Sequence, residues 1–158
     1  MIKILLIFLI CFPYVANSSL NGTYLICERT PEYFLKEQET HNENYLFVYF
    51  KKNQYLLKKI IKHDDNREIN FSLDLYNSGI YSYHDDTIKL IDNLIFREKK
   101  LKNHLNRATM ILKSNYNKEI VFEHLCKKSD LKSFIKKSNE VINDLKKFWK
   151  NKTKNNKI

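Results

Sequence analysis

Two cysteines, one in the first and one in the last of a series of short apolar runs, constrain the fold of this chain most. Cys27 ends the run Gly22–Cys27, and Cys126 ends the run Glu119–Cys126. The runs between them are rich in β-branched and aromatic residues, which predicts strands, and none of them has a clear helical period. A bond between the two cysteines would tie the first strand to the last and would close, or nearly close, the sheet between them.

The N-terminal residues predict export to a compartment where such a bond can form. Residues 1–18 contain the positive Lys3 and then a nine-residue apolar stretch, Ile4–Phe12, which is too short to span a bilayer. Small residues near Ser18 predict cleavage of a signal peptide there and a secreted or periplasmic protein, in preference to an uncleaved anchor. Cleavage would also remove Cys11, and an even number of cysteines in an exported chain favours a disulfide over two free thiols.

The strand signals recur about every ten residues, as in a β-sandwich or β-barrel. The clearest is Glu68–Tyr76, where apolar and polar residues alternate, and the following Asn77-Ser78-Gly79 predicts a turn. We therefore predict a mainly β fold over residues 19–128: an antiparallel up-and-down meander of eight or nine strands that closes into a barrel. An open two-sheet sandwich is the alternative. The predicted strands are Leu20–Glu28, Tyr45–Lys51, Gln54–Lys62, Glu68–Tyr76, Ile80–His84, Thr87–Ile91, Leu94–Arg97, His104–Lys113 and Lys118–Cys126.

The C-terminal residues change period and carry most of the net charge. From Asp130 onward apolar residues recur every three to four positions, which predicts one amphipathic helix over residues 129–150, started by Ser129 and Asp130. Residues 127–158 hold eleven Lys and three acidic residues, and residues 151–158 are predicted to be a disordered basic tail. We expect the helix to pack on the barrel; the alternative is a Lys-rich helix on an anionic membrane surface, through residues 130–158. The face expected to be buried comprises Leu131, Phe134, Ile135, Val141, Ile142, Leu145 and Phe148.

Catalytic motifs are weak in this chain. His63-Asp64-Asp65 and His84-Asp85-Asp86 offer imidazole and carboxylate ligands for a metal, but both fall in predicted turns, where Asp is favoured for backbone reasons. The sequence lacks a nucleophile elbow, a His-Glu-x-x-His pattern and a phosphate-binding glycine loop. We therefore predict no enzyme activity, no metal and no cofactor. Nucleic acid is not an expected partner, because the Lys residues are not interleaved with exposed aromatics on the sheet.

Aromatic residues give the more useful functional signal. The chain has ten Tyr and ten Phe, many of them in predicted strands. A barrel interior lined by such residues predicts a site for a small hydrophobic or aromatic ligand, whereas the alternative is that they only fill the core. The apolar island Tyr33-Phe34-Leu35 lies in the long connection Arg29–Asn44, and we expect it near the mouth of the barrel.

This layout resembles that of the lipocalins, which are calycin-type barrels. Gly22-Thr23-Tyr24 is similar to the Gly-x-Trp motif that opens their first strand, with Tyr24 in the place of the Trp. Arg29–Asn44 resembles their lid loop, and Asp130–Lys150 resembles the helix after their last strand. Arg107 or Lys127 is similar to the basic residue that packs over the Trp in that family. The resemblance implies binding of a small hydrophobic ligand or a structural role, and it implies no catalysis.

The sequence thus predicts an exported, monomeric barrel that binds a small hydrophobic or aromatic ligand inside the barrel. The alternative is a non-catalytic structural or interaction module of the cell envelope with a filled barrel, whose basic C-terminal helix contacts an anionic surface. The candidate ligand-binding residues are Tyr24, Tyr33, Phe34, Tyr49, Tyr81, Tyr83 and Arg107.

Overall fold

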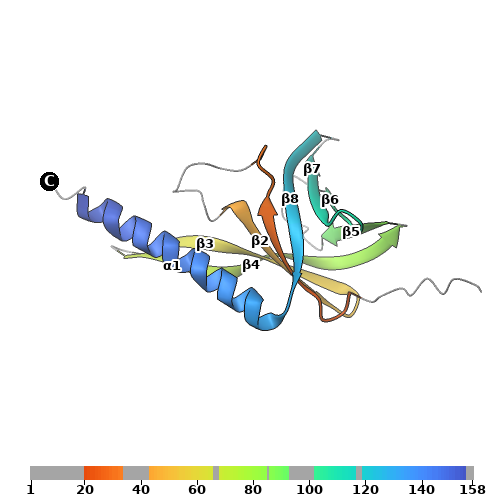
Figure 1. Ribbon diagram of the computed structural model, residues 1–158, viewed down its shortest axis with the longest axis horizontal. Coiled ribbons are helices and arrows are strands. Elements are labelled where there is room, and N and C mark those ends of the chain that lie inside the picture. Colours follow the sequence, from red (N-terminus) through yellow and green to blue (C-terminus); the bar gives the residue numbers. More distant parts are fainter. Residues whose placement is uncertain are drawn as a thin grey trace, which may run out of the picture.

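Eight antiparallel strands, paired in chain order, form a closed barrel that is followed by one helix (Figure 1). The computed structural model describes residues 20–33, 43–65, 68–84, 86–92, 102–116 and 119–155. The predicted signal peptide and the predicted strand Leu94–Arg97 lie outside these residues. The antiparallel strands, their order and the closed barrel confirm the predicted mainly β fold class. The elements are β1 (Tyr24–Arg29), β2 (Tyr45–Lys51), β3 (Gln54–Asp65), β4 (Glu68–His84), β5 (Thr87–Asp92), β6 (Lys102–Asn106), β7 (Ile111–Tyr116), β8 (Glu119–Ser129) and α1 (Leu131–Asn155).

The barrel closes where the first strand meets the last. β1 pairs with β2 on one side and with β8 on the other, so the open sandwich that was the alternative is excluded. Cys27 lies directly opposite Cys126 in the β1–β8 ladder, and their sulfur atoms are 2.04 Å apart. The predicted disulfide is therefore present, and it joins strands that backbone hydrogen bonds also join.

One end of the interior is an apolar core. Because successive side chains of a strand point to opposite faces, Leu25 and Cys27 point inward together, and they pack with apolar residues from the other strands. Leu20, before β1, is only 6% exposed and packs against the same core. Gly22, two residues after Leu20, donates a backbone hydrogen bond of 2.8 Å to the Phe50 carbonyl near the end of β2. The segment that precedes β1 therefore closes this end, which we call the Leu20 end.

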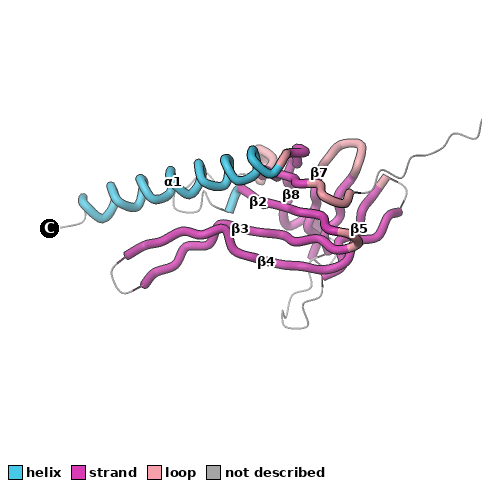
Figure 2. Tube along the Cα trace, turned by 90° about the horizontal axis from the view of Figure 1, so that it is seen from below, coloured by secondary structure: helices cyan, strands magenta, loops and turns pink. Residues whose placement is uncertain are grey.

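β3 and β4 are longer than the other strands and continue beyond the barrel as a two-stranded ribbon (Figure 2). α1 extends away from the barrel on the same side as this ribbon and packs on the outer face of the sheet (Figures 1 and 2). Among the residues that the structure describes, no helix has the length and apolar character needed to cross a membrane. The buried members of the cluster between α1 and the sheet, which we call the outer cluster, are Tyr45, Phe47, Ile60, Phe71, Phe134, Val141 and Leu145.

The two ends of α1 differ from the sequence prediction in detail. Asp130 caps the helix, since its Oδ1 accepts a 2.7 Å hydrogen bond from the Ser133 backbone N–H, and hydrogen bonds from Ser133 lower the pKa of its carboxyl. Leu131 and Ile135 were expected to be buried, but they are 52% and 48% exposed because they lie beside the contact face rather than on it. The helix continues to Asn155, so residues 151–155 of the predicted disordered tail are helical.

One predicted turn and one predicted strand are also corrected. Asn77-Ser78-Gly79 is not a turn, because β4 runs through it without a break. Gly79 is needed for close packing instead, since a Cβ atom there would lie 1.9 Å from the Ile91 carbonyl oxygen. The predicted strand His104–Lys113 is two strands, β6 and β7. Between them the Asn106 side-chain oxygen accepts hydrogen bonds from two backbone N–H groups of the turn, which is how Asn initiates turns.

Candidate functional site

The interior of the barrel has a polar end opposite the Leu20 end. Five polar side chains from five strands share the inward alternation of the core, and we call this group the polar end. It lies where β1 ends and the long connection to β2 begins. Four of its members are mostly or fully buried, which is uncommon for polar groups without a role. The polar end comprises Arg29 (β1), Lys59 (β3), Asn103 (β6), Ser114 (β7) and His124 (β8).

Arg29 is a buried cation with an incomplete set of partners. Its side chain is 7% exposed, its Nη1 donates a 3.3 Å hydrogen bond to the Tyr33 carbonyl, and its guanidinium carbon lies 4.5 Å from the centre of the Phe122 ring. Within the described residues its ion pair is with Glu43 alone, at 3.9 Å, and its Nε has no hydrogen-bond partner. Burial lowers the pKa of the guanidinium and Glu43 raises it, but an arginine stays charged.

His124 lies directly opposite Arg29 in the β1–β8 ladder. It is 2% exposed, and neither of its ring nitrogens has a hydrogen-bond partner in the part of the chain that the structure describes. Burial, together with the positive charges of Arg29 and Lys59, lowers the pKa of the imidazole to about 3. His124 is therefore neutral at physiological pH, with one nitrogen as a donor and the other as an acceptor.

Asn103 and Ser114 form a satisfied pair beside these two residues. The Ser114 hydroxyl donates a 2.6 Å hydrogen bond to the Asn103 side-chain oxygen. The Nζ of Lys59 lies 5.4 Å from the centre of the Tyr76 ring, a cation–π contact. The polar end thus combines aromatic rings, a neutral amide–hydroxyl pair and two cations, and among the described residues one carboxylate, that of Glu43, contacts them.

Tyr24 and Tyr49, two predicted ligand-binding residues, lie outside the barrel. Inward-pointing Leu25 and Cys27 force Tyr24 outward, and it stacks on Tyr49 with ring centres 4.4 Å apart. The Phe134 ring of α1 packs edge-on against Tyr24 at 5.2 Å. Tyr24 therefore packs against the helix, and neither tyrosine lines the interior.

Tyr81, Tyr83 and Arg107 lie together at the Leu20 end. The Tyr81 hydroxyl donates a 2.5 Å hydrogen bond to the Lys52 carbonyl, and the Tyr83 hydroxyl accepts a 3.2 Å hydrogen bond from the Leu20 N–H. Arg107 lies 5.3 Å from the Tyr83 ring, so it does not pack over Tyr24 as the family resemblance implied. Lys127, the other residue proposed for that position, is exposed on β8. The group braces the closed end of the barrel.

Tyr33 is the predicted residue that does reach the polar end, through the hydrogen bond from Arg29 to its carbonyl. Phe34 lies outside the described residues. Arg29 and His124 were missed by the sequence analysis, although a signal for them exists. Arg29 follows Cys27 by two positions and His124 precedes Cys126 by two, so an inward-facing disulfide predicts that both residues also face inward.

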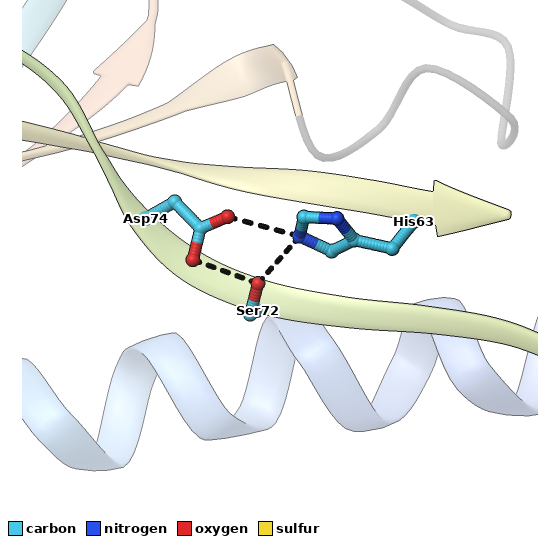
Figure 3. A network of polar contacts seen from close by, with 3 residues as sticks. All are labelled: His63, Ser72 and Asp74. Carbon is cyan, nitrogen blue, oxygen red and sulfur yellow. Dashed lines mark hydrogen bonds and ion pairs between the residues drawn. The ribbon is translucent and has the colours of Figure 1, made fainter. Parts of the chain in front are cut away.

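A second polar cluster lies on the ribbon, where His63 reaches from β3 to Ser72 and Asp74 on β4 (Figure 3). The same imidazole nitrogen, Nε2, is 2.8 Å from Ser72 Oγ and 2.9 Å from Asp74 Oδ2. The Ser72 hydroxyl itself donates to Asp74 Oδ1 at 2.8 Å. In a serine nucleophile the base takes the proton on one ring nitrogen while the carboxylate holds the other, so this cluster is not such a triad.

The repeated His-Asp-Asp elements do not meet. His63 pairs with Asn70 on the ribbon, whereas His84 ends β4 opposite Thr87, and Asp85 lies outside the described residues. Among the residues that are described, no group of three or more His, Cys, Asp or Glu side chains is placed to hold a metal ion.

No protein-family model, curated protein or solved structure matches this chain.

Proposed function

We propose that the chain is an exported, lipocalin-like barrel that binds a small hydrophobic or aromatic ligand through the polar end of its interior. Three features support this proposal. The chain forms a closed eight-stranded barrel with a C-terminal helix, the architecture of calycin-type carriers. The Cys27–Cys126 disulfide fits an oxidising compartment. Residues 1–18 have the composition of a signal peptide.

The observation that carries the proposal is the difference between the two ends of the interior, one of which is apolar and the other polar. At the Leu20 end, apolar side chains fill the interior and Tyr81, Tyr83 and the segment before β1 brace it. At the other end, Arg29 and His124 are buried with unsatisfied nitrogen atoms. A barrel with a purely structural role gains nothing from such groups, whereas binding sites pair apolar walls with a few convergent polar groups.

The experiment is a titration with a neutral apolar fluorophore, 1-aminoanthracene. We expect saturable 1:1 binding by the wild-type protein. Ser114→Leu adds an apolar side chain at the polar end and should weaken this binding about tenfold or more, because it occupies ligand space. Lys113→Leu, the matched control, places the same side chain one residue earlier on the outer face of β7 and should leave the affinity unchanged. Equal effects of the two substitutions, or no saturable binding, would contradict the proposal.

A second candidate function is contact of α1 with an anionic surface. The helix carries eight Lys and two acidic residues, and those acids make only exposed ion pairs of 3.9 and 3.8 Å with Lys136 and Lys147. Leu131 and Ile135 add half-exposed apolar side chains at its start. Vesicles with and without about 30% anionic lipid test this function, which requires binding to the anionic vesicles alone and release as added salt shortens the Debye length to about 3 Å.

A further inference from the structure

The positive charge inside the barrel is poorly balanced. Arg29 and Lys59 bring two cations to the polar end, and the one carboxylate that contacts either of them there, among the described residues, is Glu43 at 3.9 Å. The Glu43 side chain is 40% exposed, so much of its charge is screened by water. A buried cation without a close, well-aligned partner is unfavourable, and such groups in native proteins are usually paired by something.

The geometry of the unsatisfied atoms indicates what would pair them. A guanidinium presents a planar fork of donors that matches a carboxylate, and here its Nε is free to donate. The neutral imidazole of His124, opposite Arg29 in the ladder, supplies one further N–H donor. At the same polar end, Arg29 lies over the Phe122 ring and Lys59 lies over the Tyr76 ring. The surroundings therefore suit an anionic group joined to an apolar body, and they suit a free inorganic anion poorly.

We propose that Arg29, with His124 and Lys59, binds the carboxylate or similar anionic head group of an amphiphilic ligand, whose apolar body lies against the interior wall. This inference rests on the proposed ligand-binding function and names the class of its ligand. Tyr33 lies at the same end through its hydrogen bond from Arg29, so the start of the β1–β2 connection is positioned beside the head group.

Three probes separate the parts of this proposal: decanoate, its neutral analogue 1-decanol, and acetate, which has the head group without the tail. Wild-type protein should bind decanoate about ten- to a hundredfold more tightly than decanol, the range expected for hydrogen bonds to a charged group, and should bind acetate far more weakly than either. Arg29→Met should remove the preference for decanoate and leave the affinity for decanol. Lys127→Met removes the same charge from the outer face of the neighbouring strand and should keep the preference.

A second measurement does not depend on a variant that folds. In the wild-type protein, the imidazole ¹⁵N resonances of His124 should shift with decanoate and stay in place with acetate. Equal affinity for decanoate and decanol, equal losses in Arg29→Met and Lys127→Met, or unmoved His124 resonances would overturn the anionic head group and leave the proposed function intact. Acetate binding as tight as decanoate binding would overturn the apolar body. If neither decanoate nor decanol binds, the ligand-binding function fails together with this inference.

Discussion

At the scale of single residues, Gly79 shows how a small side chain can be required by packing rather than by a turn. A Cβ atom there would lie 1.9 Å from the Ile91 carbonyl oxygen and 2.9 Å from the Tyr55 ring, both of which are parts of the sheet. Gly79→Ala should therefore lower the free energy of unfolding by about 3 kcal/mol, at the upper end of overpacking effects. Gly22→Ala is the control: Gly22 has open space around it but a φ of 78°, so a loss of about 1 kcal/mol is expected. Urea denaturation that gives equal losses for the two would contradict the packing role.

The lowered pKa of His124 leads to a second prediction at this scale, which concerns the pH dependence of stability. Its pKa is about 3 in the folded protein, because burial and the nearby Arg29 and Lys59 oppose its charge, and about 6.5 when unfolded. Below pH 6.5 the unfolded chain therefore binds the proton more readily, so stability falls as the pH falls from about 6.5 toward 3. Between pH 7 and pH 5 this contribution is about 2 kcal/mol.

His124→Leu should remove that part of the acid sensitivity. Chemical denaturation at pH 7 and pH 5 measures it, and the difference between the two free energies of unfolding should be about 2 kcal/mol smaller in the variant than in the wild-type protein. Identical differences for the two proteins would mean that His124 is accessible to a proton in the folded state, against its 2% exposure.

At the scale of elements, α1 is held by one face only. Leu145 is 1% exposed and packs with the outer cluster, whereas Leu131 in the same helix is 52% exposed. Leu145→Ala should therefore cost about 3 kcal/mol of stability, and Leu131→Ala less than about 0.5 kcal/mol. Thermal melts of the two variants check this, and similar melting temperatures would show that the helix is not docked on the sheet.

The far end of α1 explains why the helix extends beyond its predicted limit. Trp149 packs against the outer cluster, and its ring lies 3.9 Å from Lys62 Nζ on the ribbon and 4.8 Å from Lys152 Nζ on the helix. Of the residues after Lys150, Lys152 therefore has a partner within the helix, the Trp149 ring. Composition alone indicated a disordered tail from residue 151 onward, because a local window of sequence does not show that Trp149, just before it, is held by Lys62 of β3.

The strands were predictable to the extent that their signals are local. Alternation in Glu68–Tyr76 and the spacing of the runs predicted a meander correctly, because these patterns depend on neighbouring residues. The glycine at position 79 is typical of a turn in the sequence. The need for glycine there comes from the close approach of Ile91 and Tyr55, which belong to other strands. The turn between β6 and β7 was missed because it lacks Gly and Pro, and Met110 there adopts a positive φ of 56°.

The proposed binding residues were less predictable, because they depend on which face of each strand is inward. The aromatic content pointed to Tyr24 and Tyr49, which are plausible interior residues by type. The disulfide sets the parity of β1, however, and it sends Tyr24 outward and Arg29 inward. Residue type alone therefore pointed to two tyrosines that face outward, whereas counting in steps of two from each cysteine selects the inward-facing Arg29 and His124.

At the scale of the whole molecule, the disulfide closes a loop with a sequence separation of 99 residues, the distance from the first strand to the last. In the chain-entropy account, its main effect is on the unfolded state, where it is worth about 4–5 kcal/mol. The double variant Cys27→Ala/Cys126→Ala should be less stable by about that amount in urea. It should still fold, because the β1–β8 ladder remains. A loss below about 1 kcal/mol would contradict this account.

The central claim is that the polar end of the barrel interior takes the ligand. Backbone amide NMR during titration of the wild-type protein with decanoate tests it most directly. The largest shifts should fall on Asn103, Ser114 and His124, which face the polar end, while Ile60 and Leu145 in the outer cluster should stay unchanged. Shifts confined to α1 and the outer face of the sheet, or no shifts at all, would contradict the claim and would favour a filled barrel with a structural role.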